Sequence, residues 1–543
     1  MDRAEASSIH GENIDSNGAR VGISLDAFLI YAPFVLAATL TFASSPDDVF
    51  ITLRYAHNLL AGYGPVYNVG ERVNGATSPA GLMLAVVALI IPGGYALLKV
   101  KLLSLLFGFL TLRLAKKLLG SLDLPPYAHR VGLFLTGASF VLAYSAANGL
   151  ETTIAAFAVT GLVLHLRNGR AFARPAAAVG FGALAILARP EAVLIVTFLI
   201  ATAICIERVR SLWSRLKWAT GAILTEVAVV GFNYFYYRSI LPNTYYAKRM
   251  AIGPALRSGF KYVITTMGPN YSTSIGIGRR FDQLLLAGTD VLIVVGFVVA
   301  VTQRKRLGYV AAAVAAQVIF VLTSGGDWMM GGRFLAPVLP QLIVLEVVGA
   351  LAIWTWAKRN VRTDVVVVAI FGGMVLAATY SYVTPGSRDP VWNMRHGINN
   401  RALIAVGGYG DGGRVWAAMP NLIACARPGQ LVATSEAGYG PFSALGVRFL
   451  DLRGLTNREI AMSAPASMKA PTGVTDINWQ QSTSPVGAVI VRSMPVLIVT
   501  LDARPEPIVL NGHYKLLGTE SFGLTRMKVY ERAGVHCPPL VRS

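Results

Sequence analysis

About eleven apolar stretches, each long enough to cross the roughly 30 Å hydrocarbon core of a bilayer, limit what this sequence can fold into. Only 14% of its 543 residues are charged, against about 25% in a typical soluble domain. A water-soluble enzyme is therefore excluded, and we expect a polytopic α-helical membrane protein. The stretches lie near residues 25–43, 97–118, 131–147, 150–166, 173–188, 191–206, 214–235, 287–302, 307–323, 334–356 and 364–383.

The excess of positive charge indicates the topology of the chain. Lys and Arg number 48 against 28 Asp and Glu, and the basic clusters recur after every second crossing, as at 167–174, 208–217 and 303–306. Because Lys and Arg concentrate in cytoplasmic loops, these loops are predicted to be cytoplasmic, and nucleic acid is a poor inference from the charge. Residues 1–24 lack a signal-peptide pattern and are expected to be a disordered cytoplasmic lead.

The composition divides the rest of the chain into a membrane core, residues 25–384, and a soluble α/β domain outside, residues 385–543. Short β-like runs predict strands in that domain at 431–434, 447–450, 486–491, 496–501 and 527–530. Pro79 to Ile91 is apolar, but the Pro92-Gly93-Gly94 break favours an interfacial or re-entrant piece, and whether it crosses stays open. Among three scattered cysteines only a Cys425 to Cys537 pair is conceivable, and it too stays open.

The first external loop, residues 44–78, is the richest in polar groups. Ser45, Pro46 and Asp48 fit a capping box that starts a helix over 49–60. Helical spacing places Asp47, Ile51, Arg54 and Asn58 on one stripe, and Asp48, Thr52 and Tyr55 on the next. Capping and catalysis can coexist here, because a carboxylate at a helix N-terminus is held in place and ionised.

Further polar groups lie at the external ends of the later helices. Each has a plain explanation by itself, as a snorkelling cation, an interfacial aromatic or a structural ion pair. Charge at mid-bilayer costs on the order of 3 kcal/mol, so their gathering at one face favours a site. The candidates are Glu151, Arg189, Glu191, Asn243, Tyr246, Lys248, Asp327, Trp328 and Arg333.

Sugar transfer from a polyprenyl phosphate would use such a set of residues. The leaving group is already a stable anion, so the reaction needs a carboxylate to accept the proton of the acceptor hydroxyl and cations to hold the phosphate. We expect Asp47 to be the catalytic base with Asp48 supporting it. Lys248, Arg333 and Arg189 would form the cationic part of the donor site. A divalent ion beside Asp47 and Asp48 would help neutralise the phosphate, but no ligand set has diagnostic spacing.

The motifs resemble a known family. Asp47-Asp48 through Asn58, Gly62 through Glu71-Arg72, and Thr77-Ser78-Pro79 closely resemble the first external loop of bacterial GT-C glycosyltransferases. Within them, the chain looks most like the terminal arabinofuranosyltransferase group of mycobacterial cell-wall synthesis. Later motifs follow in the same order: Gly149-Leu150-Glu151-Thr152, Arg189-Pro190-Glu191, Pro242-Asn243-Thr244 with Lys248, Gly325 to Met329 with Gly332-Arg333-Phe334, Gly438-Tyr439-Gly440 and Asp451 to Thr456.

The resemblance implies a GT-C membrane core with a C-terminal periplasmic domain, in a bacterial inner membrane with the N-terminus cytoplasmic. It also implies a polyprenyl-phosphate-linked sugar donor, a glycan or glycoconjugate acceptor, and Asp47 or Asp48 at the reaction centre. Arg54, Tyr55, Asn58 and Glu71 join the substrate-binding candidates. The runner-up is a protein O-mannosyl-type or other lipid-linked-sugar transferase. A lipid-linked-sugar transporter is the non-enzymatic alternative, although the sequence shows neither broken mid-membrane helices nor symmetric halves.

Overall fold

The structure is a computed structural model that describes residues 24–42, 45–207, 211–266, 279–302, 307–329, 332–358, 370–375, 418–476, 478–501, 509–522 and 525–538. Several expectations fall outside these ranges. They are the disordered lead, the basic loop at 303–306, nearly all of the last apolar stretch, and the first part of the C-terminal domain.

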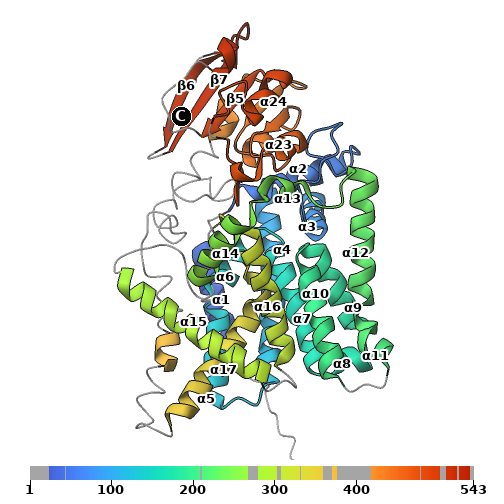
Figure 1. Ribbon diagram of the computed structural model, residues 1–543, viewed down its shortest axis with the longest axis vertical. Coiled ribbons are helices and arrows are strands. Elements are labelled where there is room, and N and C mark those ends of the chain that lie inside the picture. The colour runs from blue at the N-terminus through green and yellow to red at the C-terminus, as the bar shows by residue number, and fades with distance from the viewer. Residues whose placement is uncertain are drawn as a thin grey trace, which may run out of the picture.

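Helices make up the N-terminal two thirds of the chain, and most begin and end within a few residues of the expected apolar stretches (Figure 1). Serines cap several of them, as where the Ser24 and Ser139 side chains accept hydrogen bonds from the first turns of α1 and α6. The helices are α1 (Leu25–Thr41), α2 (Asp48–Leu60), α3 (Pro79–Ile90), α4 (Ala96–Gly120), α5 (Pro126–Gly137), α6 (Phe140–Ala147), α7 (Thr152–Arg167), α8 (Arg170–Ala173), α9 (Ala176–Ala188), α10 (Ala192–Ile206), α11 (Leu212–Leu216), α12 (Thr220–Phe232), α13 (Asn243–Lys248), α14 (Ile252–Thr266), α15 (Arg279–Thr302), α16 (Gly308–Ser324) and α17 (Leu339–Ala357).

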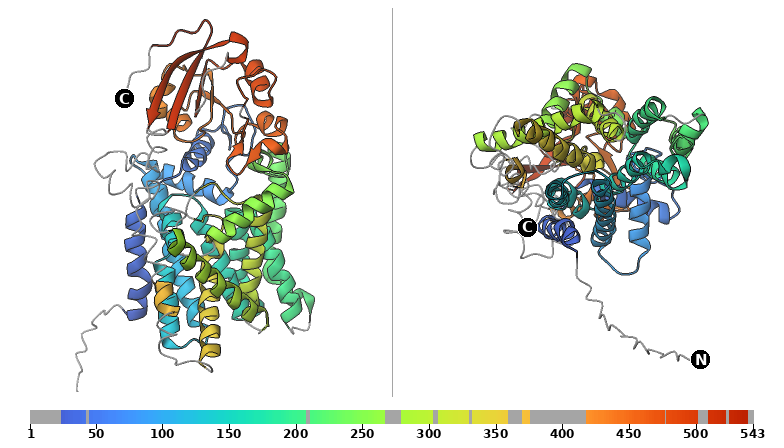
Figure 2. Two further views of the ribbon diagram at one scale, coloured as in Figure 1. Left: turned by 60° about the vertical axis from the view of Figure 1, so that its left-hand side comes forward. Right: turned by 90° about the horizontal axis from the view of Figure 1, so that it is seen from below.

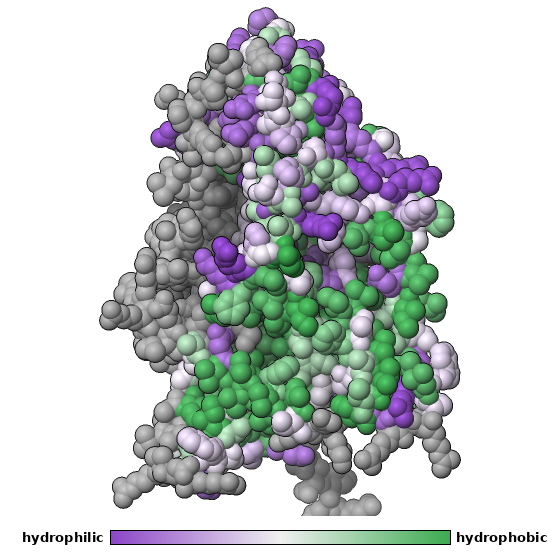
Figure 3. Space-filling view, viewed as in Figure 1, coloured by the Kyte–Doolittle hydropathy of each residue, from purple (hydrophilic) through white to green (hydrophobic). Residues whose placement is uncertain are grey.

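The surface of this helical body fits a multi-pass membrane protein. Apolar side chains cover most of its visible face, whereas polar ones gather on the C-terminal domain above it (Figure 3). By length and composition, the helical stretches 126–147 and 336–357 could each cross a membrane, and seven shorter apolar helices accompany them in the described part of the chain. The expected number of about eleven crossings is not established by these helices.

Two segments differ in detail from the apolar stretches expected from the sequence. The stretch near 131–147 is interrupted, because α5 ends at Gly137 and Ser139 starts α6. The Pro79 to Ile91 piece forms α3, whose twelve residues span only about 18 Å, less than the core of a bilayer. Its length therefore suits an interfacial element better than a full crossing.

The C-terminal domain lies on one end of the helical body, opposite α8 and α11 (Figures 1 and 2). Its five-stranded sheet has the order β2-β1-β5-β7-β6, in which β1 pairs in parallel with β2 and β5, while β7 runs antiparallel to β5 and β6. The strands are β1 (Leu431–Thr434), β2 (Arg448–Asp451), β5 (Leu497–Leu501), β6 (Tyr514–Phe522) and β7 (Thr525–Arg532); β3 (Lys469–Ala470) and β4 (Gly473–Val474) form a separate hairpin.

The expected strand at 486–491 is wrong, because this run lies in the helix α24 (Pro485–Ser493). Ser484 caps it by accepting from the Gly487 N–H, and Pro485 occupies the first turn, where a missing N–H costs nothing. Val486, Val489 and Ile490 are buried with helical rather than alternating spacing. The chain also has β3, β4 and β6, which the sequence did not indicate.

The sheet has two buried faces, and one of them joins the domain to the membrane core. Leu497 and Val499 of β5 belong to an apolar cluster with Val49, Phe50 and Leu53 of α2. Ile498, pointing the other way, packs in a cluster shared with α23 (Arg458–Ser463) and α24. Helix α2 is therefore buried under the sheet rather than lying exposed on a lipid surface.

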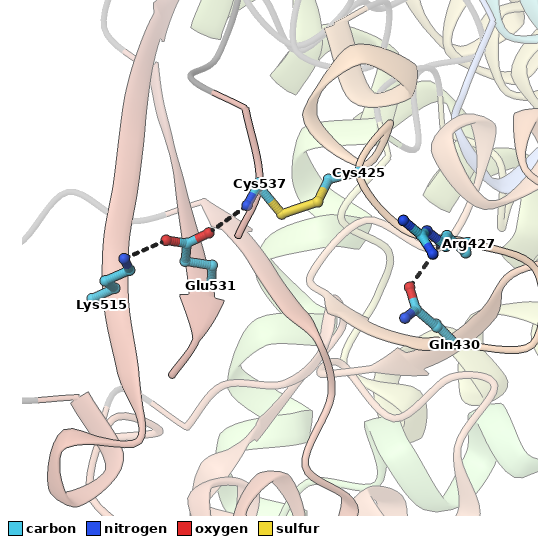
Figure 4. The surroundings of a disulfide bond; sticks show 6 residues. All are labelled: Cys425, Arg427, Gln430, Lys515, Glu531 and Cys537. Carbon is cyan, nitrogen blue, oxygen red and sulfur yellow. Dashed lines mark hydrogen bonds and ion pairs between the residues drawn. A yellow bond between two sulfur atoms is a disulfide. The ribbon is translucent and has the colours of Figure 1, made fainter. Parts of the chain in front are cut away.

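A disulfide joins Cys425 to Cys537, with the Cα atoms 5.6 Å apart, and settles the pairing that the sequence left open (Figure 4). Next to it, the Glu531 carboxylate accepts from the Cys537 N–H at 3.0 Å and pairs with the Lys515 ammonium at 2.8 Å. The segment after β7 is thus tied back to the segment just before β1. Disulfides persist in oxidising compartments, which agrees with a domain outside the cytoplasm.

Candidate active site

A cavity of about 860 Å³ lies between the domain-side ends of the helices and the C-terminal domain. Its wall includes the start of α2, the loop 75–78, the joints before α7 and α10, the segment 241–252, the end of α16 and parts of the C-terminal domain. Six of the expected site residues line it: Asp48, Glu151, Arg189, Glu191, Lys248 and Arg333. Residues spread over nearly 300 positions therefore converge on one cavity of a size that suits a small-molecule ligand.

Two buried arginines organise the acids of this cavity. Arg189 donates to Glu191 at 2.7 Å and to Glu151 at 2.9 Å. Arg333 forms a two-pronged pair with Asp327, at 2.7 and 3.2 Å, and its Nη1 lies 3.6 Å from Asp48 Oδ2. The ring of Phe334 lies beside both guanidinium groups, with its centroid 5.1 Å from Arg189 Cζ and 5.5 Å from Arg333 Cζ.

Lys248, the last residue of α13, supplies a cation of a different kind. Its ammonium has no hydrogen bond or ion pair with any residue in the described part of the chain. Burial lowers its pKa, and the charge of Asp48 acts in the opposite direction. Asn243 at the other end of α13 donates to the carbonyls of Gly454 at 2.7 Å and Leu455 at 3.1 Å, which fixes the helix to the C-terminal domain. Within the described part of the chain, Lys248 is thus a cavity-lining cation without a partner.

The capping box expected at the start of α2 is wrong. The helix begins at Asp48 with Asp47 in the cap position, and no side chain makes a capping hydrogen bond. Ser45 Oγ is buried and has no hydrogen bond to a described residue. Asp47 instead accepts from the backbone N–H groups of Gly438 at 2.7 Å and Tyr439 at 2.8 Å, in the C-terminal domain.

Asp47 and Asp48 therefore face different surroundings. Asp47 is 5% exposed and is absent from the cavity wall, and burial, followed by the nearby Glu436 carboxylate, raises its pKa well above the ordinary value. A Cβ at Gly438 would come within 2.2 Å of the Asp47 carboxyl carbon, so only glycine allows this close approach. The Asp48 side chain is 22% exposed and lines the cavity.

Three other residues of α2 are tied to backbone rather than to the cavity, which corrects their assignment to substrate binding. Arg54 is 1% exposed and donates to the carbonyls of Tyr67, Pro441, Ala444 and Val447. Tyr55 donates to the Val73 carbonyl at 2.6 Å and accepts from the Gly75 N–H. Asn58 donates to the carbonyls of Val66 and Tyr67. These side chains shape the first loop and attach the domain.

The remaining candidates also lie off the cavity wall. Glu71 pairs with Arg448 of the C-terminal domain, and Asn243 and Asp327 act through the contacts described above. Tyr246 packs with Ala247, Leu455 and Ala461. Trp328 is 41% exposed. Of this group, only Asp327 touches a charged residue of the cavity wall.

The cavity includes residues that were not among the candidates. Thr77 lines it with φ 54°, a left-handed conformation that is strained for a β-branched residue, and its hydroxyl lies 3.1 Å from that of Thr244. Thr77 belongs to the Thr-Ser-Pro motif, so the motif was a usable signal. Arg249 and Lys469 also line the wall. Lys469 lies in β3, and no motif marked it.

Metal ligands were the least specific expectation. In the described residues, no group of three or more His, Cys, Asp or Glu side chains is arranged to hold a metal ion. The cavity carboxylates of Asp48, Glu151 and Glu191 lie instead within ion-pairing distance of arginine. We assign no metal-holding residues.

Comparison with solved structures gives the class of the fold. No profile of a known protein family matches the sequence. The apo crystal structure of ArnT from Cupriavidus metallidurans superimposes with a TM-score of 0.50 over 93% of this chain and 97% of that chain, at 13% identity. This likeness shows that the chain shares the fold of ArnT. A second ArnT structure, bound to undecaprenyl phosphate, covers 94% of this chain and 98% of that chain at a TM-score of 0.46 and 13% identity.

At the level of sequence, the chain is similar to the terminal β-(1→2)-arabinofuranosyltransferase of Mycobacterium tuberculosis (strain ATCC 25618 / H37Rv), with 30% identity over 338 residues. The match covers 56% of this chain and 52% of the relative, so the chain spans about half the length of that protein. The expected resemblance to this group is confirmed.

Proposed function

We propose that the protein is a membrane glycosyltransferase that moves a sugar, arabinofuranose, from a polyprenyl phosphate to a cell-envelope glycan. One observation carries the proposal: Asp48 and Lys248, whose ammonium is unpaired among the described residues, line one cavity, with Arg333 between two carboxylates beside them. A base and a phosphate-binding cation are the two groups that this transfer requires. The identity of the sugar rests on the similarity to the arabinofuranosyltransferase.

In this mechanism Asp48, rather than Asp47, is the catalytic base. The acceptor hydroxyl gives its proton to the Asp48 carboxylate, and its oxygen forms a bond to the anomeric carbon of the donor sugar. The bond between that carbon and the phosphate oxygen breaks, and the electron pair stays on the phosphate. Asp47 is poorly suited to this role because both of its carboxylate oxygens already accept backbone hydrogen bonds.

Lys248 and Arg333 would hold the phosphate. The donor is a phosphodiester with one negative charge, and the departing polyprenyl phosphate acquires a second, so the charge develops during the reaction. A buried cation that is already in place stabilises that charge more than the ground state. Arg189 is less suited than Arg333, because it hydrogen-bonds two carboxylates, those of Glu151 and Glu191. Arg333 hydrogen-bonds only that of Asp327 among the described residues, and its Nη1 lies 3.6 Å from Asp48.

We also propose that the C-terminal domain faces the periplasm and the basic loops near α8 and α11 face the cytoplasm. These two ends lie at opposite poles of the helical body (Figure 1), and the Cys425–Cys537 disulfide supports an oxidising side for the domain.

The test is transfer by the purified full chain in vesicles, with polyprenyl-phosphoryl arabinofuranose and polyprenyl-phosphoryl mannose as alternative donors and an arabinan oligosaccharide as acceptor. We expect product from the arabinofuranose donor, and its loss in Asp48→Asn. Product from the mannose donor alone would show that the transferred sugar is mannose rather than arabinofuranose. Movement of the donor across the vesicle membrane without any transfer would favour the transporter alternative.

A further inference from the structure

A second pair of cations lines the cavity apart from the groups assigned above. Arg249 directly follows α13, and Lys469 lies in β3 of the C-terminal domain. Helix α13 packs against the β3–β4 hairpin, which brings the two side chains to the same part of the wall. Their positions about 220 residues apart in the sequence explain why no motif connected them.

Neither cation is neutralised within the described part of the chain. Among the described residues, no carboxylate lies within ion-pairing distance of either group, and the ring centroid of Tyr245 lies 5.9 Å from Arg249 Cζ. Burial lowers the pKa of Lys469, and the charge of Arg249 lowers it further, so the two groups repel each other. Arg189 and Arg333 of the same cavity, in contrast, each lie beside two carboxylates.

The position of the pair indicates which substrate would meet it. The phosphate of a lipid donor is proposed to lie near Asp48, Lys248 and Arg333. Lys469, with Leu455, Ala466 and Pro471, forms the wall that the C-terminal domain contributes. A water-soluble glycan approaches from the domain side, whereas a polyprenyl chain approaches from the membrane. The pair therefore lies on the acceptor side of the cavity.

We propose that Arg249 and Lys469 bind a phosphoryl group on the acceptor glycan. This inference rests on the proposed function, because it assigns the second substrate of that site. A guanidinium fork beside an ammonium suits a phosphate, which accepts several charge-assisted hydrogen bonds at once. The bound anion would also relieve the repulsion between the two cations.

The test uses two acceptor oligosaccharides that differ only in one phosphoryl group, with wild-type protein and the double variant Arg249→Gln/Lys469→Gln. The wild type should prefer the phosphorylated acceptor, and the double variant should reduce the ratio of the two kcat/KM values by about tenfold or more, as expected for two lost charge-assisted contacts. The charge-preserving variant Arg249→Lys/Lys469→Arg should restore most of the preference. The matched control Arg257→Gln/Lys261→Gln removes two exposed cations of α14 that do not line the cavity, and should leave the ratio unchanged.

Three results would overturn the inference. In the first, the wild type shows no preference for the phosphorylated acceptor. In the second, the double variant weakens binding of the lipid donor and leaves the ratio intact, which assigns the pair to the donor phosphate. In the third, the double variant loses activity equally with the phosphorylated and the unphosphorylated acceptor. Direct binding of the phosphorylated acceptor to the wild type and to the double variant is measured as well. Absence of transfer would then count against the proposed function, whereas the binding measurement would still test the acceptor site.

Discussion

The two sides of α2 at its N-terminus have opposite tasks, although their acidic residues are neighbours. The side with Asp47 and Arg54 is buried against the C-terminal domain, and the side with Asp48 faces the cavity. Adjacent residues of a helix point about 100° apart, which is enough to place one carboxylate in a domain interface and the other in the cavity wall.

The buried side holds the short helix α22 (Tyr439–Ser443) at both of its ends. Asp47 accepts from the N–H groups of Gly438 and Tyr439, and Arg54 donates to the carbonyls of Pro441 and Ala444. The acidic side chain of Asp47 therefore lies at the N-terminus of α22, and the guanidinium of Arg54 lies at its C-terminus. Unpaired backbone N–H and C=O groups at these two ends favour such partners. The charges on this side of α2 dock the domain, and docking in turn closes the cavity that Asp48 faces.

The largest effect is expected from Asp48→Asn, which tests the cavity side. Asparagine keeps the shape of the side chain but cannot accept the proton, so transfer should fall by about 100-fold or more. Donor binding and thermal stability should remain close to those of the wild type. The measurement is kcat for sugar transfer together with the donor dissociation constant. Near-normal turnover in Asp48→Asn with a folded but inactive Asp47→Asn would restore the roles expected from the sequence.

Lys248→Met should have the next largest effect, since it removes a cation and keeps the bulk of the side chain. We expect donor affinity to fall by roughly tenfold, and kcat to fall as well because negative charge grows on the departing phosphate. Arg333→Met should act in the same direction. Lys261→Met, at an exposed position of α14 off the cavity wall, is the control and should leave both quantities unchanged. Unchanged donor binding in Lys248→Met and Arg333→Met together would remove both residues from the donor site.

Asp47→Asn should affect the stability of the domain interface more than the chemistry. The amide would place an N–H group against one of the two backbone donors, and leaving a buried donor unsatisfied costs about 1–3 kcal/mol. The thermal midpoint of the full chain should therefore decrease, while transfer falls by less than about tenfold because Asp48 is retained. Asp123→Asn, at an exposed carboxylate after α4, serves as the matched control. An unchanged midpoint would separate Asp47 from domain docking.

The sequence was a good guide to what depends on local pattern. Apolar runs predicted most of the helices, and the charges at helix ends pointed to Glu151, Arg189 and Lys248, which line one cavity. It was a poor guide to Arg54, because three of its carbonyl partners lie nearly 400 positions away, and nothing near Arg54 indicates that it is buried. The strand predicted at 486–491 was wrong for another reason, because a short apolar segment fits a strand or a buried helix equally well.

The smallest effect is expected from pH, and it tests the cation on the cavity side. Burial lowers the pKa of Lys248, so its ammonium loses a proton below the ordinary range of lysine, near 10.4. The charged form binds the phosphodiester. Donor affinity should therefore be fully present below that lowered pKa and decrease as the pH rises through it, while the diester itself keeps its single charge. Lys248→Arg, whose side chain stays charged at these pH values, should bind the donor with little change from pH 7 to about 10. The measurement is donor binding by both proteins across this range. An identical alkaline decrease in wild type and Lys248→Arg would assign the titration to another group. Arg333 would then be the cation assigned to stabilise the negative charge that develops on the departing phosphate.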